Sequence, residues 1–215
     1  MSRSGHGVFI TFEGGEGAGK TTQLQALRRV LEARGVTVTA TREPGGTAGA
    51  EAIRDLVLGG VVERWSHGVE ALLMTAARLD HVERLIGPAL AAGHWVLSDR
   101  FSDSTRAYQG IAGGLGTARI DALHDLFLPS PRPDLTLLLD LSVTKGLGRR
   151  AEAGGGSRFE ARDMAFHERV RAGFLELAAV EPERFVVIDA AAPAEAVAAR
   201  TEAAVLARFA DRLAG

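Results

Sequence analysis

The residues that could do chemistry gather first between positions 14 and 21. Gly14, Gly19, Lys20 and Thr21 match the pattern G-x-x-x-x-G-K-[ST], between an apolar run and a helix-period segment. Such glycines let backbone N–H groups turn toward phosphate oxygens, and the following helix adds its positive N-terminus. The lysine can reach the β- and γ-phosphates, and the threonine hydroxyl can ligate Mg²⁺. The segment predicts a nucleoside triphosphate site; a glycine-rich turn with a chance lysine is the alternative.

Basic residues are used unevenly along the chain. Of the 25 basic residues, only Lys20 and Lys145 are lysines, and all the others are arginines. Arginine presents a planar fork of donors, whereas lysine presents a compact point charge. The lysine in the phosphate-binding pattern therefore indicates a specific requirement for a point charge at that position.

Two further groups of charged residues follow apolar runs. Asp99 ends the run 94–99, and Arg100 comes next; Arg42 lies in "REPGGT" after the run 35–40. A carboxylate at a strand end can hold Mg²⁺, usually through water, and arginine can grip a phosphate by its fork. These residues predict a metal ligand at Asp99 and a phosphate-gripping arginine at Arg42. The alternatives are a strand-end salt bridge between Asp99 and Arg100 and a surface position for Arg42.

The elements that must position these residues alternate along the chain. Apolar runs typical of buried parallel strands occupy 7–12, 35–40, 94–99, 135–141 and 184–189. Helix-period segments separate them, including a long one at 69–92, and Gly35 and Gly93 follow two of the helices as stop signals. The alternation predicts an α/β fold with three layers and a mostly parallel sheet. A ligand should lie outside the carboxyl ends of its strands.

Composition limits the class of protein. The chain has 215 residues, 46% hydrophobic and 24% charged, with a net charge of −2 and no cysteine. These values predict a single domain over 1–215, and argue against a disulfide framework, a thiolate metal site and a nucleic-acid partner. We find no apolar stretch typical of a secretory signal or a membrane span, so we expect a cytoplasmic protein with no membrane partner.

A mobile lid is predicted at about residues 146–162. The segment "GRRAEAGGGSRFEARD" mixes arginines with three consecutive glycines, and both of its flanks have helical patterns. Segments of this kind can close over a ligand. A disordered tether is the alternative.

The absence of asparagine excludes one class of phosphate-loop protein. Guanine-specific switch proteins usually read their base with an Asn-Lys-x-Asp motif, which this chain cannot contain. Large ATPases need a longer chain. A small phosphotransferase is therefore the leading class.

Five segments in order resemble bacterial thymidylate kinase, from about residue 8 to residue 190. They are "FEGGEGAGKTTQ", "TREPGGT", "LLMTAARLDHV", "SDRFSDSTRAYQG" and "RFEARDMAFHERVRAGFLELA". The resemblance implies a P-loop kinase fold with a five-stranded sheet and a lid. It implies transfer of the γ-phosphoryl group of ATP to dTMP, giving dTDP, with Mg²⁺ in the site. It also implies a homodimer.

The resemblance assigns roles to residues of this chain. The implied catalytic residues are Glu16, Lys20, Asp99, Arg100 and Arg149. The implied ATP-binding residues are Gly14, Gly15, Glu16, Gly17, Ala18, Gly19, Lys20, Thr21, Thr22, Arg149 and Arg150. The implied acceptor-binding residues are Glu16, Arg42, Pro44, Leu56, Met74, Arg78, Arg100, Ser104, Thr105, Tyr108 and Gln109. Thr21 and Asp99 are the implied metal ligands, and the turn 190–193 is expected near adenine.

Two positions depart from the common family pattern. Met74 stands where many members have a phenylalanine that stacks on thymine, and a thioether can also contact an aromatic face. Ordinary core packing is the alternative for Met74. Gly17 stands where some members have a catalytic arginine, which implies that lid arginines supply that charge; the candidates are Arg149, Arg150, Arg158 and Arg162.

Several alternatives stay open at the level of sequence. Arg158 could pair with Glu160 or Asp163 and hold the lid instead of reaching a phosphate. Glu16 could be a solvated loop carboxylate, and His81 could support Arg78 from one helical turn away. The rival functions are a P-loop kinase of another nucleoside monophosphate and a catalytically silent nucleotide-binding module.

Overall fold

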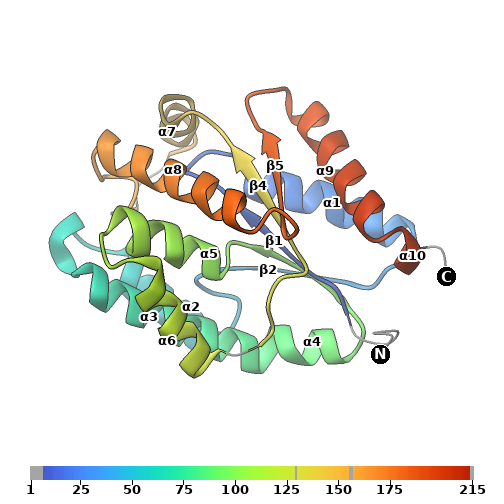
Figure 1. Ribbon diagram of the computed structural model, residues 1–215, viewed down its shortest axis with the longest axis horizontal. Coiled ribbons are helices and arrows are strands. Elements are labelled where there is room, and N and C mark those ends of the chain that lie inside the picture. Colours follow the sequence, from blue (N-terminus) through green and yellow to red (C-terminus); the bar gives the residue numbers. More distant parts are fainter. Residues whose placement is uncertain (1–6, 129, 155–156, 214–215) are drawn as a thin grey trace.

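A computed structural model describes residues 7–128, 130–154 and 157–213 of the chain (Figure 1). These residues form one five-stranded parallel sheet in the order β2-β3-β1-β4-β5. The strands are β1 (Phe9–Glu13), β2 (Val38–Arg42), β3 (Trp95–Asp99), β4 (Leu135–Asp140) and β5 (Phe185–Asp189). The predicted α/β class and the five-stranded sheet are confirmed. The sheet is wholly parallel within the described residues.

Helices connect the strands. The longer ones are α1 (Lys20–Ala33), α2 (Ala48–Leu58), α3 (His67–His81), α6 (Thr117–Phe127), α7 (Val143–Glu152), α8 (Met164–Val180) and α9 (Ala194–Arg208). The short ones are η1 (Val62–Arg64), η2 (Val82–Ile86), α4 (Gly87–Ala91), α5 (Ser102–Thr105), η3 (Arg106–Ala112) and α10 (Ala210–Leu213). None of the helices in the described residues combines the length and the apolar composition that a membrane span requires.

Helices cover both faces of the sheet, as Figure 1 shows. On one face, α1 and α9 pack together, and Leu24, Leu27 and Leu31 of α1 share a core with Val197 and Val205 of α9. On the other face, α8 lies against β4 and β5, and α4 lies against β3. Because both faces are buried, β1, β3 and β4 are almost continuously apolar, which is why they could be recognised in the sequence.

Two predicted boundaries move because of local backbone chemistry. The strand predicted at 35–40 begins at Val38, because Gly35 and Val36 donate backbone hydrogen bonds to the last turn of α1. Gly35 adopts φ 81°, the left-handed conformation that ends a helix. The long helical segment 69–92 is α3 continued through the π-helical turn η2 into α4.

Candidate active site

A cleft of about 650 Å³ lies at the carboxyl ends of β2 and β3, beside the start of α1. Most residues that the sequence singled out line it. They are Glu16, Gly17, Ala18, Gly19, Lys20, Thr21, Thr22, Arg42, Pro44, Met74, Arg78, Asp99, Arg100, Ser104, Thr105, Tyr108, Gln109, Arg149 and Arg150. Gly14, Gly15 and Leu56 are not among the lining residues.

Leu58 lines the cleft where Leu56 was expected. Both residues belong to α2, and two positions along an α-helix turn a side chain by about 200°. Leu56 is therefore directed to the opposite face of α2, where it is 38% exposed.

The phosphate loop connects β1 to α1 with three glycines at positive φ. Gly14, Gly17 and Gly19 have φ 138°, 66° and 87°, values that side chains other than glycine rarely tolerate. Lys20 begins α1, and its Nζ donates to the carbonyl of Gly15 at 2.7 Å and to that of Gly14 at 3.2 Å. Burial and the charge of Arg100 lower the pKa of Lys20 to about 8, against the opposing effect of nearby carboxylates. The lysine is thus a buried cation held by two backbone carbonyl oxygens of the loop.

Glu16 is the carboxylate at the centre of the loop. It accepts hydrogen bonds from Arg100 at 3.1 Å and from the Tyr108 hydroxyl at 2.8 Å. Burial acts to raise the pKa of Glu16, but the charges of Arg100 and Lys20 outweigh it and hold that pKa at about 2. Glu16 is therefore an ionised, fixed group that orients Arg100, and not a solvated loop carboxylate.

Arg100 reaches the phosphate loop from the end of β3. Its backbone has φ 74°, the one positive value for a non-glycine residue in the described part of the chain. Its Nη1 donates to the Gly14 carbonyl at 3.0 Å and to Ser104 at 3.1 Å, and its guanidinium lies over the Tyr108 ring. These contacts hold the guanidinium at the junction between the loop and the acceptor side of the cleft.

Thr21 and Asp99 face each other as expected for a divalent-cation site. The Thr21 hydroxyl donates to the Asp99 carboxylate at 2.5 Å. Mg²⁺ prefers one or two protein oxygen ligands together with water and phosphate oxygens. The described residues contain no cluster of three or more His, Cys, Asp or Glu side chains suited to a metal. A hydroxyl beside a carboxylate fits a cation that takes its remaining ligands from a nucleotide and water.

Arginines gather at the end of β2 on the acceptor side. Arg42 is paired with Glu51 at 2.9 Å and is half-exposed, so its guanidinium is accessible from the cleft. Arg54 also lines the cleft and donates to the Pro44 carbonyl at 2.6 Å. Sequence reasoning missed Arg54, because an arginine within an amphipathic helix carries no signal of its own.

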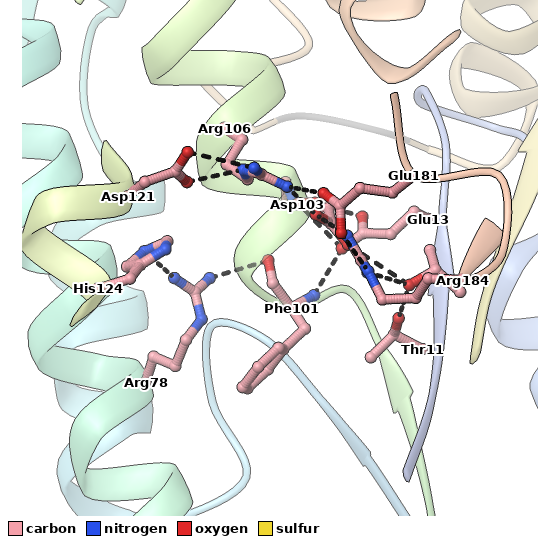
Figure 2. A network of polar contacts seen from close by, with 12 residues as sticks. Thr11, Glu13, Arg78, Phe101, Asp103, Arg106, Asp121, His124, Glu181 and Arg184 are labelled. Carbon is pink, nitrogen blue, oxygen red and sulfur yellow. Dashed lines mark hydrogen bonds and ion pairs between the residues drawn. The ribbon is translucent and has the colours of Figure 1, made fainter. Parts of the chain in front are cut away.

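Arg78 is buried in a network that fixes its orientation (Figure 2). Its Nε donates to Glu43 at 2.6 Å, its Nη1 to Thr105 and to His124 at 3.1 Å each, and its Nη2 to the Phe101 carbonyl at 2.9 Å.

Neighbouring histidines complete this network. Burial and the charge of Arg78 lower the pKa of His124 to about 3, so its ring is neutral and can accept from the arginine. His81 contacts the other oxygen of Glu43 at 3.1 Å and thereby supports Arg78, which is the role expected from its position one turn away.

Glu13 and an ionic cluster around the buried Asp103 support the segment that follows Arg100 (Figure 2). Glu13 accepts from the backbone N–H groups of Phe101 and Ser104. Asp103 receives a two-pronged contact from Arg184, at 2.6 and 2.9 Å. Arg184 in turn joins Thr136, Glu181 and Arg106 to the same cluster.

The four arginines of the segment predicted to be a lid separate into two pairs. Arg149 and Arg150 line the cleft; Arg149 donates to the Ala190 carbonyl at 3.4 Å, and Arg150 pairs with Glu160 at 2.8 Å. Arg158 and Arg162 both pair with Glu70 of α3, at 2.7 and 2.8 Å. The proposed pairing of Arg158 with Glu160 or Asp163 is wrong.

The reason is that both candidate partners of Arg158 have other contacts. Glu160 binds Arg150, and Asp163 caps the start of α8 by accepting from the Phe166 N–H at 2.7 Å. The lid prediction also covers Gly155 and Gly156, which lie outside the described residues.

Apolar side chains complete the lining of the cleft. Phe159 adds an aromatic ring to the acceptor side, where Met74 stands, and it packs edge-to-face with Tyr108. Ala190, Ala192, Ala194 and Val197 form an apolar wall at the far end, near the turn expected to face adenine. Small apolar residues of this kind cannot be told from core residues in a sequence.

Known proteins resemble this chain over most of its length. The family model described as thymidylate kinase matches residues 12–201. The thymidylate kinase of Caulobacter vibrioides is 54% identical over 203 residues, which cover 94% of this chain and 98% of that protein. The thymidylate kinase of Rhizorhabdus wittichii is 54% identical over 196 residues, covering 90% and 94%.

A solved structure agrees with both matches. The crystal structure of thymidylate kinase from Ehrlichia chaffeensis superposes with a TM-score of 0.75 at 34% identity, covering 93% of this chain and 98% of that chain. The matched region includes the phosphate loop, the Asp99–Arg100 pair and the arginine-bearing segment before α8. The chain belongs to the thymidylate kinase family.

Proposed function

We propose that the chain transfers the γ-phosphoryl group of ATP to dTMP with the residue roles given below, and that Mg²⁺ takes part. The acceptor dTMP follows from membership of the thymidylate kinase family. The observation that carries the residue roles is the meeting of the phosphate loop, Asp99 and Arg100, and the pair Arg149 and Arg150 in one cleft. These groups come from distant parts of the sequence. A cleft that brings them together can hold two substrates in the orientation that a transfer reaction requires.

The donor nucleotide would lie along the phosphate loop. Backbone N–H groups between Gly14 and Thr21 and the N-terminus of α1 would hold its phosphates, and Lys20 would place its charge between the β- and γ-phosphates. The adenine would lie toward the apolar wall at Ala190 and Ala192. Thr21 and Asp99 would hold Mg²⁺, which when bound neutralises phosphate charge.

The acceptor would occupy the other half of the cleft. Arg42 and Arg100 are the fork donors suited to its phosphate, and Glu16 fixes the angle of Arg100. Arg78 has four of its five N–H donors committed to protein acceptors, which leaves one for the base. Met74, Leu58 and Phe159 would surround the base with apolar contacts.

The chemical step is an in-line displacement. An oxygen of the acceptor phosphate forms a bond to the γ-phosphorus, the bond from that phosphorus to the β–γ bridging oxygen breaks, and ADP leaves with the electron pair. Negative charge spreads over the equatorial oxygens during the transfer. Lys20, with Arg149 or Arg150, would stabilise this charge, because a preorganised cation needs no reorganisation as the charge develops.

We also propose that two copies of the chain associate in the cytoplasm. Val69 and Leu72 on α3 are 38% and 58% exposed, and Leu126 and Phe127 at the end of α6 are also exposed. Apolar side chains on these two helices offer a surface that a second copy could cover. Sedimentation velocity of the purified chain tests this assembly.

The function is tested by measuring ADP release from ATP and Mg²⁺ with dTMP, dUMP, dCMP, dGMP and AMP as acceptors. We expect strong turnover with dTMP and little with the others, because Met74 and Phe159 line the cleft and would pack against the 5-methyl group. Equal turnover of dUMP would mean that Met74 does not select thymine. Absence of ADP with every acceptor would favour a silent nucleotide-binding module.

A further inference from the structure

Glu70 is a buried carboxylate that the transfer mechanism does not use. It lies in the first turn of α3, its side chain has no exposed surface, and it is not among the residues that line the cleft. An ionised carboxylate in such a place must be paired, since an unpaired buried charge is strongly unfavourable. Its partners therefore show which parts of the protein it holds together.

The two oxygens of Glu70 face different parts of the protein. Oε2 accepts from the Gln109 side-chain amide at 2.9 Å and contacts His67 Nδ1 at 3.3 Å. Oε1 contacts Arg158 Nη1 at 2.7 Å and Arg162 Nη2 at 2.8 Å. Gln109 lines the acceptor side of the cleft, whereas the two arginines come from the segment between α7 and α8. One rigid carboxyl group thus joins the acceptor pocket to that segment.

Arg158 anchors the segment more firmly than a surface ion pair would. Its side chain is fully buried, and it also donates to the carbonyls of Val57 at 2.6 Å and Val62 at 3.1 Å. These carbonyls belong to the end of α2 and to η1. The arginine is therefore fixed by three contacts from the acceptor side of the molecule.

The connection continues to a cleft arginine. Two residues beyond Arg158, Glu160 pairs with Arg150 Nη2 at 2.8 Å. Phe159, which lies between them in sequence, lines the cleft itself. Contacts therefore run from Gln109 through Glu70 to Arg158, the backbone continues from Arg158 to Glu160, and Glu160 contacts Arg150.

We propose that Glu70 is a positioning residue. It links acceptor binding to the placement of the segment between α7 and α8, and through that segment to the placement of Arg150 beside the donor phosphates. A nucleoside monophosphate that binds Gln109 would fix the plane of the Glu70 carboxylate. The carboxylate in turn would fix Arg158 and Arg162, and with them Glu160 and Arg150. The inference rests on the proposed roles of Gln109 and Arg150.

The test is the effect of dTMP on the binding of a non-hydrolysable ATP analogue in the presence of Mg²⁺. Calorimetry gives the Kd of the analogue with and without saturating dTMP, and the ratio of the two values measures the coupling between the sites. For the wild-type chain we expect saturating dTMP to lower the Kd of the analogue by about fivefold or more, which is the lower end of typical coupling between sites. A loss of general stability does not by itself change this ratio.

Arg162→Gln is the first variant, because it removes the ion pair between Arg162 and Glu70 and leaves the buried pair of Arg158 and Glu70 in place. We expect the ratio to fall below the wild-type value, because Glu70 then holds the segment through Arg158 alone, with binding of each ligand alone retained. Arg169→Gln is the matched control: Arg169 of α8 donates to the Ala112 carbonyl of η3 at 3.3 Å and does not pair with Glu70. Its ratio should equal that of the wild type.

Glu70→Gln extends the test, and a folded Glu70→Gln protein should also lose the coupling. If Arg162→Gln retains the full ratio, or if the wild type has a ratio of one, the inference is overturned. If one of these results is found while the wild type turns over dTMP normally, the inference fails and the proposed function survives. If the wild type does not turn over dTMP, both are overturned.

Discussion

At the scale of single residues, the cleft works through groups whose ionisation its surroundings set. Glu16 keeps its charge because Arg100 and Lys20 face it, and Lys20 is easier to deprotonate than a free lysine because it is buried near Arg100. His124 stays neutral beside Arg78 for the same reasons of burial and like charge. Each group is thereby held in the state that its hydrogen bonds require.

Replacing the phosphate-loop lysine should remove turnover without unfolding the chain. In Lys20→Ala, the cation between the donor phosphates is lost, and we expect kcat to fall at least about a hundredfold, as for the loss of one charge-stabilising group. Steady-state ADP release measures the effect. Lys145→Ala, at the other lysine and in an exposed position, is the control and should keep its activity. A Lys20→Ala protein with most of its activity would contradict the role of Lys20.

Glu13 should make stability depend on pH. Burial and the charge of Asp103 raise its pKa to about 7, whereas in the unfolded chain the pKa is near 4.5. Between these two values the folded state binds more protons than the unfolded state, so stability falls as the pH rises through this window. A difference of this size corresponds to about 3 kcal/mol.

Glu13→Gln should remove the fall in stability that the wild type shows as the pH rises. The amide mimics the protonated carboxyl group and can still accept from the N–H groups of Phe101 and Ser104. The difference in unfolding free energy between the variant and the wild type should therefore grow by about 3 kcal/mol from pH 4.5 to pH 7.5. Urea unfolding at a series of pH values measures it. A constant difference would mean that Glu13 titrates alike in both states.

At the scale of elements, the phosphate loop and α7 touch through glycines. A Cβ on Gly17 would lie 2.0 Å from the Gly146 carbonyl oxygen, and a Cβ on Gly146 would lie 2.2 Å from the Glu16 carbonyl oxygen. Both neighbours are backbone atoms, which cannot move aside as a flexible side chain can. The contact leaves no room for a side chain at Gly17 and sets the distance from the loop to the helix that carries Arg149 and Arg150.

Gly146→Ala should therefore impair catalysis. The added methyl group must displace the carbonyl of Glu16 or tilt α7, and we expect kcat/KM for ATP to fall about tenfold or more, because small displacements of catalytic groups are costly. Gly148→Ala, in the same helix and with no atom within 4 Å of the new Cβ, is the control. Its activity should be unchanged, and its stability should rise by up to about 1 kcal/mol through helix propensity. Equal kinetics for the two variants would exclude the close contact.

At the scale of the whole molecule, a buried ionic cluster joins segments that are distant in sequence. Arg184, just before β5, binds Asp103 of α5 and Thr136 of β4 (Figure 2). Thr136 shares a hydrogen bond with Thr11 of β1 at 2.9 Å. The cluster thus ties the helix that follows Arg100 to three strands of the sheet.

Breaking this cluster should lower the free energy of unfolding much more than breaking an exposed ion pair does. Arg184→Met leaves Asp103, which is 1% exposed, without its main counter-charge, and we expect a loss of about 3 kcal/mol in unfolding free energy. Arg132→Met breaks the pair with Asp125, whose side chains are 76% and 62% exposed, and should cost less than about 1 kcal/mol. Denaturant unfolding of both variants measures the difference. Similar values would show that Asp103 is not held by Arg184.

The sequence by itself determined those features that local pattern encodes. The phosphate loop, the apolar strands and the charges at strand ends follow from residue type and spacing over a few positions, because backbone geometry and burial act locally. Lys20, Thr21, Asp99 and Arg100 are predicted from such patterns, and all four line the cleft. The same local information does not contain which face of α2 meets the cleft, so the sequence predicts Leu56 where the structure has Leu58.

The tertiary structure decided the pairing of charges. Four arginines of one segment are equivalent in sequence, yet two of them line the cleft and two bind Glu70, about ninety residues away. The packing of the elements likewise decided that Arg54 lines the cleft and that Arg184 pairs with Asp103. An ion pair depends on which side chains the packed elements bring within about 4 Å, and a spacing along the chain does not contain that distance.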